Sequence, residues 1–225
     1  MSSARTTIHQ VGHSRVPVVE IDHFAADPAA LVREAAALSF GPAGPHYPGL
    51  RARAASTTVQ ALLAPLSGLL ADVYGLSGRV QVIGCDWSLV TTPPEALTLV
   101  QRLPHVDVPD PARVAVLLYL SASDLGGTGL FRHRDTGLER LGPDDFGPYH
   151  ASLAAGLART GPPPPAYIAR STELFDLVHV IDAAPGRLAI YPSNALHSGL
   201  VPADLPMSTD PARGRLTLNA FLGPA

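Results

Sequence analysis

Residues 79–92 read RVQVIGCDWSLVTT, and from this stretch onward the chain consists mainly of strand-forming sequence. Further runs rich in apolar and β-branched residues follow, each bounded by turn-forming residues, at 113–120, 128–134, 174–181, 187–192 and 215–222. Several short strands separated by turns are typical of a barrel or a two-sheet jelly roll. A doubly wound α/β fold is disfavoured, because helices do not alternate with these strands.

The segment before residue 79 has a different pattern. Residues 16–24 alternate like a strand, and Asp27 is placed to cap a helix that begins with a proline. Residues 40–52 hold three prolines and three glycines and are expected to form a loop. A second helix is expected over roughly 57–74, weakened at Pro65. We therefore expect a mainly β fold of the α+β class, with the N-terminal helices packed outside the barrel.

The length of 225 residues suits one domain with a sizeable core. We expect this domain to span 1–225, with 1–78 as an N-terminal strand and helical support and 79–225 as the β core. An insertion at 139–172 interrupts the core. It contains the helix-forming stretch YHASLAAGLAR and the stiff polyproline tract GPPPPA.

The composition excludes several classes of function. The net charge is −3, so the chain offers no positive field for nucleic acid or an anionic membrane. All 16 basic residues are arginines, which excludes lysine Schiff-base, pyridoxal and Walker-type chemistry. The single Cys85 lies in an apolar stretch and is expected to be a buried thiol. We find no apolar run of signal-peptide or membrane-spanning length, so the expected location is the cytoplasm.

Two His-x-Asp pairs are candidate metal ligands: His105 with Asp107, and His133 with Asp135. In an extended strand, residues two apart project from the same face, so either pair could offer an imidazole and a carboxylate to one ion. His197 follows a predicted strand and turn, and a jelly roll can bring it beside such a pair. Two histidines and one carboxylate on one face of a metal suit non-haem Fe(II). An isolated His-x-Asp is more often an ordinary solvated strand face.

The last predicted strand carries a polar stripe. Arg215, Thr217 and Asn219 share one face, while apolar residues share the other. A strand half exposed to water would have the same pattern. An arginine that follows a ligand histidine is also well suited to grip a dicarboxylate through its two-pronged guanidinium.

These motifs together resemble those of the Fe(II)/2-oxoglutarate-dependent oxygenases of the prolyl 4-hydroxylase branch, and most closely those of the bacterial family DUF6445. The resemblance covers almost the whole chain. The stretches that carry it are PHYPGLRA (45–52), SLVTTPP (88–94), LPHVD (103–107), GGTGLFRHR (126–134) and GRLTLNAF (214–221).

The resemblance implies a double-stranded β-helix, a jelly-roll or cupin-like fold. It implies His105, Asp107 and His197 as iron ligands, because the family places its iron pair before the strand that precedes the Gly-Gly-Thr turn. The pair at 133 and 135 follows that turn and is disfavoured on this ground.

The resemblance also implies that Arg215 holds the far carboxylate of 2-oxoglutarate. Thr217 fits the family's Arg-x-Ser/Thr pair, and Tyr119 is placed to add a hydroxyl to the same carboxylate. Arg213 has the same strand parity as Arg215 and is the alternative anchor. Asn219 is expected to line the cofactor or substrate pocket.

The implied cofactors are Fe(II), 2-oxoglutarate and O2, with ascorbate as an optional reductant. Asp107 favours hydroxylation, because halogenating relatives replace this carboxylate with a small residue; desaturation and ring closure use the same triad. The expected substrate is an amino acid, a peptide or a natural-product intermediate, and the oligomeric state, including a homodimer, stays open. Candidate substrate contacts are Tyr47, Arg51, Trp87, Arg132 and His133.

Two other functions compete with this interpretation. A cupin-like protein could hold a divalent ion or a small ligand without turnover, but such a protein has no use for the dicarboxylate anchor. A metal-dependent cupin isomerase would be built on the same barrel, with a ligand set richer in histidine. Succinate release from 2-oxoglutarate would separate the three.

Overall fold

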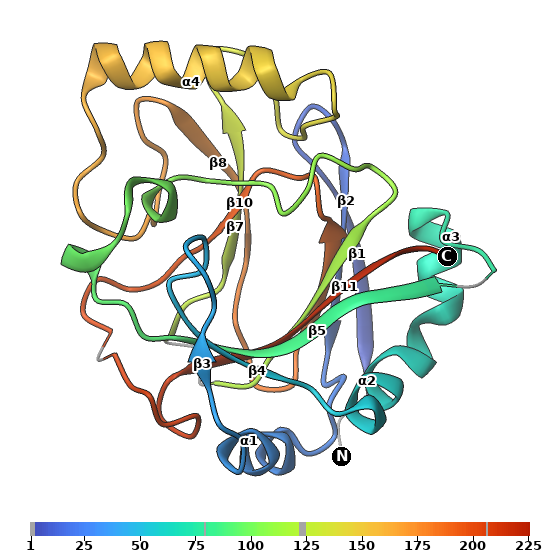
Figure 1. The fold of residues 1–225 in the computed structure, drawn as a ribbon. Coiled ribbons are helices and arrows are strands. Elements are labelled where there is room, and N and C mark those ends of the chain that lie inside the picture. The colour runs from blue at the N-terminus through green and yellow to red at the C-terminus, as the bar shows by residue number, and fades with distance from the viewer. Residues whose placement is uncertain (1–2, 79, 122–124, 206) are drawn as a thin grey trace.

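The computed structural model describes residues 3–78, 80–121, 125–205 and 207–225, and within them the chain forms two antiparallel β-sheets (Figure 1). The larger sheet has the strand order β1-β2-β9-β6-β11-β5-β4-β3, and the smaller has the order β10-β7-β8. This mostly antiparallel arrangement is jelly-roll-like, as the strand pattern predicted.

The strands of the larger sheet are β1 (Arg5–Val11), β2 (Val16–Asp22), β3 (Gly41–Pro42), β4 (Gly49–Arg53), β5 (Val80–Val90), β6 (Val114–Tyr119), β9 (Leu188–Pro192) and β11 (Arg215–Pro224). Those of the smaller sheet are β7 (Thr128–His133), β8 (Phe175–Ile181) and β10 (His197–Gly199). The helices are α1 (Pro28–Ala36), α2 (Ser56–Leu63), α3 (Ser67–Tyr74) and α4 (Phe146–Thr160), and the 3-10 turns are η1 (Ala64–Leu66), η2 (Pro94–Ala96) and η3 (Leu99–Arg102).

The N-terminal segment forms more strand than expected. The helix capped by Asp27 is confirmed, since its Oδ1 accepts a hydrogen bond from the Ala30 amide at 2.9 Å. The second helix is confirmed with a 3-10 break at the predicted proline. The predicted loop at 40–52 is wrong in part, because β4 pairs with β5 there. An added Cβ at Gly49 would collide with the carbonyl of Leu89 on β5, so the close approach of the strands depends on this glycine.

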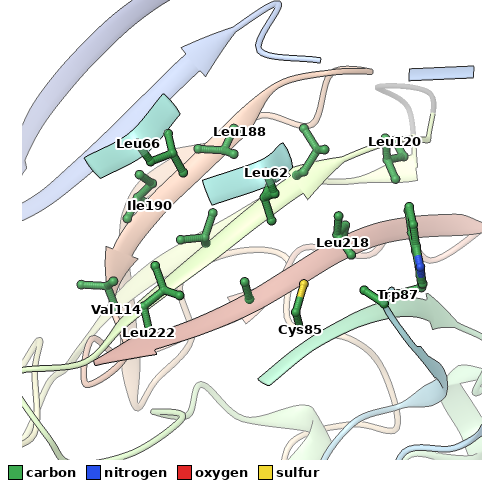
Figure 2. Close-up of a cluster of buried hydrophobic side chains, with 14 of the residues drawn as sticks. Leu62, Leu66, Cys85, Trp87, Val114, Leu120, Leu188, Ile190, Leu218 and Leu222 are labelled. Atoms are coloured by element: carbon green, nitrogen blue, oxygen red, sulfur yellow. The ribbon is translucent and has the colours of Figure 1, made fainter. Parts of the chain in front are cut away.

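Helices α1, α2 and α3 cover one face of the larger sheet, and their contact forms the main hydrophobic core (Figure 2). Among the labelled side chains, Leu62 and Leu66 come from the helical segment, while Leu188, Ile190 and Leu218 come from the sheet. The predicted buried thiol of Cys85 lies in this core, where burial raises its pKa to about 11. Burial of so many aliphatic side chains fixes which face of each strand points away from the helices.

The other face of the larger sheet packs against the smaller sheet. Their shared core includes Leu117, Tyr119 and Tyr191 from the larger sheet and Leu130 and Ile181 from the smaller. Helix α4, from the predicted insertion, covers the far side of the smaller sheet (Figure 1). The space between the sheets is therefore bounded by structure on both sides.

The register of β11 determines which face of the larger sheet carries the polar stripe of Arg215, Thr217 and Asn219. Thr217 lies opposite Tyr119 on β6 and opposite Ser88 on β5. Directly paired residues project to the same side of an antiparallel sheet, so the stripe shares the inner face with Tyr119. The alternate residues Leu216 and Leu218 belong to the helix-side core. No helix in the part of the chain that the structure describes is long and apolar enough to cross a membrane.

Candidate metal and cofactor site

His105 and His197 are held together by their backbones. His105 lies in the loop between η3 and β6, and His197 is the first residue of β10. Each amide donates a hydrogen bond to the other residue's carbonyl, at 2.9 and 2.8 Å. The two imidazole rings lie 4.6 Å apart between centroids. His105 is the exposed member of the pair, and His197 is buried.

Asp107 completes a cluster of three candidate ligands. Its amide donates to the carbonyl of Ser193 at 2.9 Å, which ties the loop to the end of β9. Its Oδ1 lies 3.8 Å from the Nε2 of His197. One ligand atom from each of His105, Asp107 and His197 lies within 4.8 Å of the others. The two-histidine, one-carboxylate set that the sequence predicted is therefore brought together.

The chemistry of these atoms fits a divalent ion. The Nδ1 of His197 lies 2.9 Å from the carbonyl of Ala195, and as a donor to it leaves Nε2 with a free lone pair. Burial lowers the pKa of His197 to about 4, which keeps the ring neutral, the form that binds metals. Burial raises the pKa of Asp107 to about 6, and its Oδ2 is enclosed without a hydrogen-bond partner among the described residues. A cation would satisfy that oxygen.

The second His-x-Asp pair does not form such a cluster. His133 is fully buried between Tyr149 and Phe175, and its Nδ1 lies 2.9 Å from the hydroxyl of Thr136. Asp135 instead pairs with Arg159 at 2.9 Å. Because β7 places His133 on the face covered by α4, it does not line the space between the sheets, contrary to its expected role as a substrate contact.

Arg215 is buried at the start of β11 and is fixed by the Gly-Gly turn. Its Nε donates to the carbonyl of Gly126 at 3.1 Å, and its Nη2 donates to that of Gly127 at 2.7 Å. No carboxylate of the described residues pairs with it. An ideal Cβ at Gly199 would lie 3.8 Å from Nη2, so the guanidinium sits beside β10, two residues along from His197.

A buried guanidinium with no counter-ion in the described chain is suited to an anionic ligand, because an uncompensated buried charge is costly. The separation of two residues along β10 corresponds to about 7 Å. An elongated diacid could therefore reach from the metal cluster to Arg215. The alternative, Arg213, is exposed in the preceding turn.

The hydroxyl groups near Arg215 are arranged by the sheet register. Tyr119 donates its hydroxyl hydrogen bond to the Oγ1 of Thr128 at 2.6 Å, and Thr217 lies opposite Tyr119. All three are buried. Tyr191 is a residue that the sequence analysis missed: its ring packs 4.9 Å from that of His197. Its place in the Tyr-Pro stretch just before the turn to that histidine is the one signal that could have pointed to it.

Arg51 lies in the middle of β4, and Tyr47 lies in the loop before this strand. The Arg51 guanidinium stacks over the Tyr47 ring at 4.5 Å, and its Nε donates to the Ser88 hydroxyl at 3.2 Å. Burial raises the pKa of Tyr47, opposed by the nearby guanidinium groups of Arg215 and Arg51. The Tyr47 hydroxyl is buried without a hydrogen-bond partner among the described residues. These two predicted contacts are placed near the anionic-ligand end of the site.

Asn219 lies further along β11, opposite Asp86 on β5 and Leu117 on β6. It is 9% exposed, and its Oδ1 is buried with no hydrogen-bond partner in the described part of the chain. An unpaired buried amide oxygen on the inner face is consistent with the pocket-lining role expected of it.

Two other predicted substrate contacts lie elsewhere. Trp87 is fully buried in the helix-side core, because it pairs with Leu218 on the face turned away from the site (Figure 2). Arg132 pairs with Asp176 at 2.8 Å and approaches Glu139 at 3.8 Å. Trp87 is thus a core residue, and Arg132 an ion-paired residue of the smaller sheet.

The comparisons with known proteins agree with the architecture. The model of a family of unknown function, DUF6445, matches residues 2–222. No curated protein matches the chain by sequence. The solved structure of the epimerase SnoN in complex with Fe3+, alpha ketoglutarate and nogalamycin RO is similar with a TM-score of 0.54 and 15% identity, over 92% of this chain and 79% of SnoN. The non-heme alpha ketoglutarate dependent carbocyclase SnoK from nogalamycin biosynthesis gives 0.51 and 11%, over 92% and 80%. At these identities the likeness shows a shared fold.

Proposed function

The chain belongs to DUF6445, a family of unknown function, and from its site we propose that it is an Fe(II)- and 2-oxoglutarate-dependent oxygenase built on a double-stranded β-helix. The observation that carries the proposal is that two features lie close to each other. One is the cluster of His105, Asp107 and His197, and the other is the buried Arg215 beside the strand that carries His197. A protein that only holds a metal needs the first feature and not the second.

The three ligands would hold the iron, and their surroundings fix them before it binds. The carbonyl of Ala195 orients the His197 ring, and the carbonyl of Ser193 fixes the backbone of Asp107. Two imidazoles and one carboxylate leave the other side of an octahedral ion open for exchangeable ligands. When bound, iron and 2-oxoglutarate supply the oxidising chemistry, with O2 as the oxidant, succinate and CO2 as co-products and ascorbate as an optional reductant.

Arg215 would bind the far carboxylate of 2-oxoglutarate and so set its orientation toward the metal. Since two of its donors are already fixed by the carbonyls of Gly126 and Gly127, the guanidinium is held in place before the ligand arrives. Tyr119 and Thr217 would support the same carboxylate. The apolar inner core, which includes Leu117 and Leu130, would exclude water from the reacting region.

Hydroxylation of an amino acid, a peptide or a natural-product intermediate is the proposed reaction. Structures of similar fold include an epimerase and a carbocyclase, so the fold itself does not select hydroxylation. The retained Asp107 supports it over halogenation. Arg51, Tyr47 and Asn219 are the proposed substrate-facing residues. The proposal also places the chain in the prolyl 4-hydroxylase branch of these oxygenases. It further assigns the protein to the cytoplasm.

Succinate release from 2-oxoglutarate tests the proposal. The purified chain is supplied with Fe(II), ascorbate and 2-oxoglutarate, with and without a library of amino acids and short peptides. We expect iron-dependent succinate formation that rises when the correct substrate is present. Binding of the ion without any succinate would favour the non-catalytic cupin-like protein, and conversion of a substrate without consumption of 2-oxoglutarate would favour a cupin isomerase.

A further inference from the structure

A second group of metal-ligating side chains lies away from the site described above, where β1 and β2 face β8. We propose that His9, Glu20 and His179 form a second binding site for a divalent ion of the zinc type. One ligand atom from each of the three lies within 4.8 Å of the others. This site plays no part in the proposed reaction and stands independently of it.

The distances in the cluster suit a small tetrahedral ion. The Nε2 of His9 lies 3.1 Å from the Oε1 of Glu20, and the Nε2 of His179 lies 3.5 Å from the same oxygen. Two ligands that each lie about 2.0–2.1 Å from a tetrahedral zinc ion are about 3.3 Å apart. The two imidazole rings are 4.9 Å apart and inclined by 47°. Small movements would therefore bring all three ligands onto one ion.

The sheet register explains why these residues meet. On the β1–β2 hairpin, His9 lies opposite Val18, so Glu20 is its diagonal neighbour on the same face. On β8, His179 lies opposite Leu130, which belongs to the core between the sheets. All three side chains therefore point into the same space from two different sheets.

Two further observations favour a cation over a simple ion pair. The Nε2 of His179 is buried and makes no hydrogen bond within the described residues, since its 3.5 Å contact with the Oε1 of Glu20 does not have hydrogen-bond geometry. The other carboxylate oxygen of Glu20 is held by Arg187 at 3.5 Å, and Arg187 is in turn held by Asp22 at 2.7 Å. These contacts leave Oε1 turned toward the two imidazoles. In metal sites, groups behind the ligands orient them in the same way.

An ion at this position would link the two sheets. β1 and β2 lie at one edge of the larger sheet, and β8 is an edge strand of the smaller sheet. Binding to the folded chain and not to the unfolded chain stabilises the fold by mass action. The three protein ligands would leave one position of a tetrahedral ion for water, and His9, about one-third exposed, is open to the entering ion.

Zinc stoichiometry tests the proposal. Chelator-treated protein is titrated with Zn²⁺ alone against a chromophoric competitor, in the wild type, Asp107→Ala, His179→Ala and the double variant. We expect two equivalents in the wild type, one in each single variant and none in the double variant. His150→Ala, which removes an exposed histidine of α4, is the control and should keep both equivalents.

The outcomes separate the two sites. If Asp107→Ala binds no zinc, or if His179→Ala still binds as much as the wild type, the second site is refuted. One equivalent in the wild type and none in His179→Ala would instead support the second site and speak against metal binding by the first. His9→Gln, on the partly exposed edge strand, replaces His179→Ala if that variant does not fold, and it should lower zinc affinity at least tenfold.

Discussion

Arg215 and Arg213 are separated by one residue but lie in different surroundings. Arg215 is buried and fixed by the turn at Gly126, whereas Arg213 is exposed. We expect Arg215→Ala to raise the KM for 2-oxoglutarate at least tenfold, because a charged hydrogen bond to a carboxylate contributes about 1.5–3 kcal/mol. Steady-state kinetics with varied 2-oxoglutarate measure this. Arg213→Ala is the matched control. If only Arg213→Ala raised the KM for 2-oxoglutarate, the anchor would be Arg213, and its assignment to Arg215 would be wrong.

Asp107 should cost stability in the metal-free protein. Burial raises its pKa to about 6 from an ordinary value near 3.8. With respect to this carboxyl, the free energy of unfolding is therefore highest below about pH 3.8, where the group is protonated in both the folded and the unfolded chain. It falls as the pH rises through about 6. Asp107→Asn has no such titration, so its stability relative to the wild type should rise by about 1–3 kcal/mol between about pH 4 and about pH 7.

Urea denaturation of chelator-treated protein at several pH values measures this difference. A difference between Asp107→Asn and the wild type that does not change with pH would show that the carboxylate is not held in a desolvated position. Added metal should reverse the order of stability, because the wild type keeps all three ligands.

At the residue scale, the three candidate metal ligands named from the sequence lie together in the structure, whereas three candidate substrate contacts, Trp87, Arg132 and His133, lie away from that cluster. Residue type and spacing made both His-x-Asp pairs candidates, and only the family resemblance favoured His105 and Asp107, with His197, over the pair at 133 and 135. Trp87 was not placed correctly, because an aromatic residue in an alternating strand suits either face. Only the register with β4 and β11 decides that it points toward the helices.

At the scale of elements, the Gly-Gly turn before β7 connects the fold to the site. An added Cβ at Gly127 would collide with the carbonyl of Ile181 on β8, and the carbonyl of Gly127 accepts from Arg215. We expect Gly127→Ala to lower the free energy of unfolding by about 1–3 kcal/mol and to raise the KM for 2-oxoglutarate. Chemical denaturation and kinetics check the two effects.

Gly68→Ala is the matched control for that variant. This glycine lies in α3, and a Cβ there meets nothing within 4 Å. Replacing a helical glycine by alanine stabilises by up to about 1 kcal/mol, so this variant should be neutral or slightly more stable and fully active. If both variants behave alike, the turn at Gly127 has no special role in orienting Arg215.

The predicted elements after residue 79 are confirmed because their apolar runs are continuous and bounded by turns. β4 was missed because its flanking prolines and glycines suggest a loop, and only pairing with β5 makes it a strand. β1 was missed because almost all of its residues are exposed, so no apolar alternation marks it. Both strands are stabilised by their neighbours more than by their own sequence.

At the scale of the whole molecule, the fold places two sheets face to face and seals their outer faces with helices (Figure 1). The cluster of candidate ligands is assembled across this arrangement. His105 and Asp107 lie in the loop that leads into β6 of the larger sheet, and His197 lies on β10, an edge strand of the smaller sheet. Such long-range meetings cannot be derived from local periodicity. From the sequence, the meeting of His197 with His105 and Asp107 could be predicted only from the order of the motifs along the chain.

We propose that Asp107 and His197, and not the other His-x-Asp pair, support iron-dependent oxidation of 2-oxoglutarate. The most direct measurement is succinate formation with and without Fe(II) by the wild type, Asp107→Ala, His197→Ala and Asp135→Ala. We predict no iron-dependent succinate from the first two variants and an unchanged rate from Asp135→Ala, whose carboxylate only pairs with Arg159. Unchanged turnover in Asp107→Ala or His197→Ala would contradict the site, and the absence of succinate from the wild type would contradict the proposed activity.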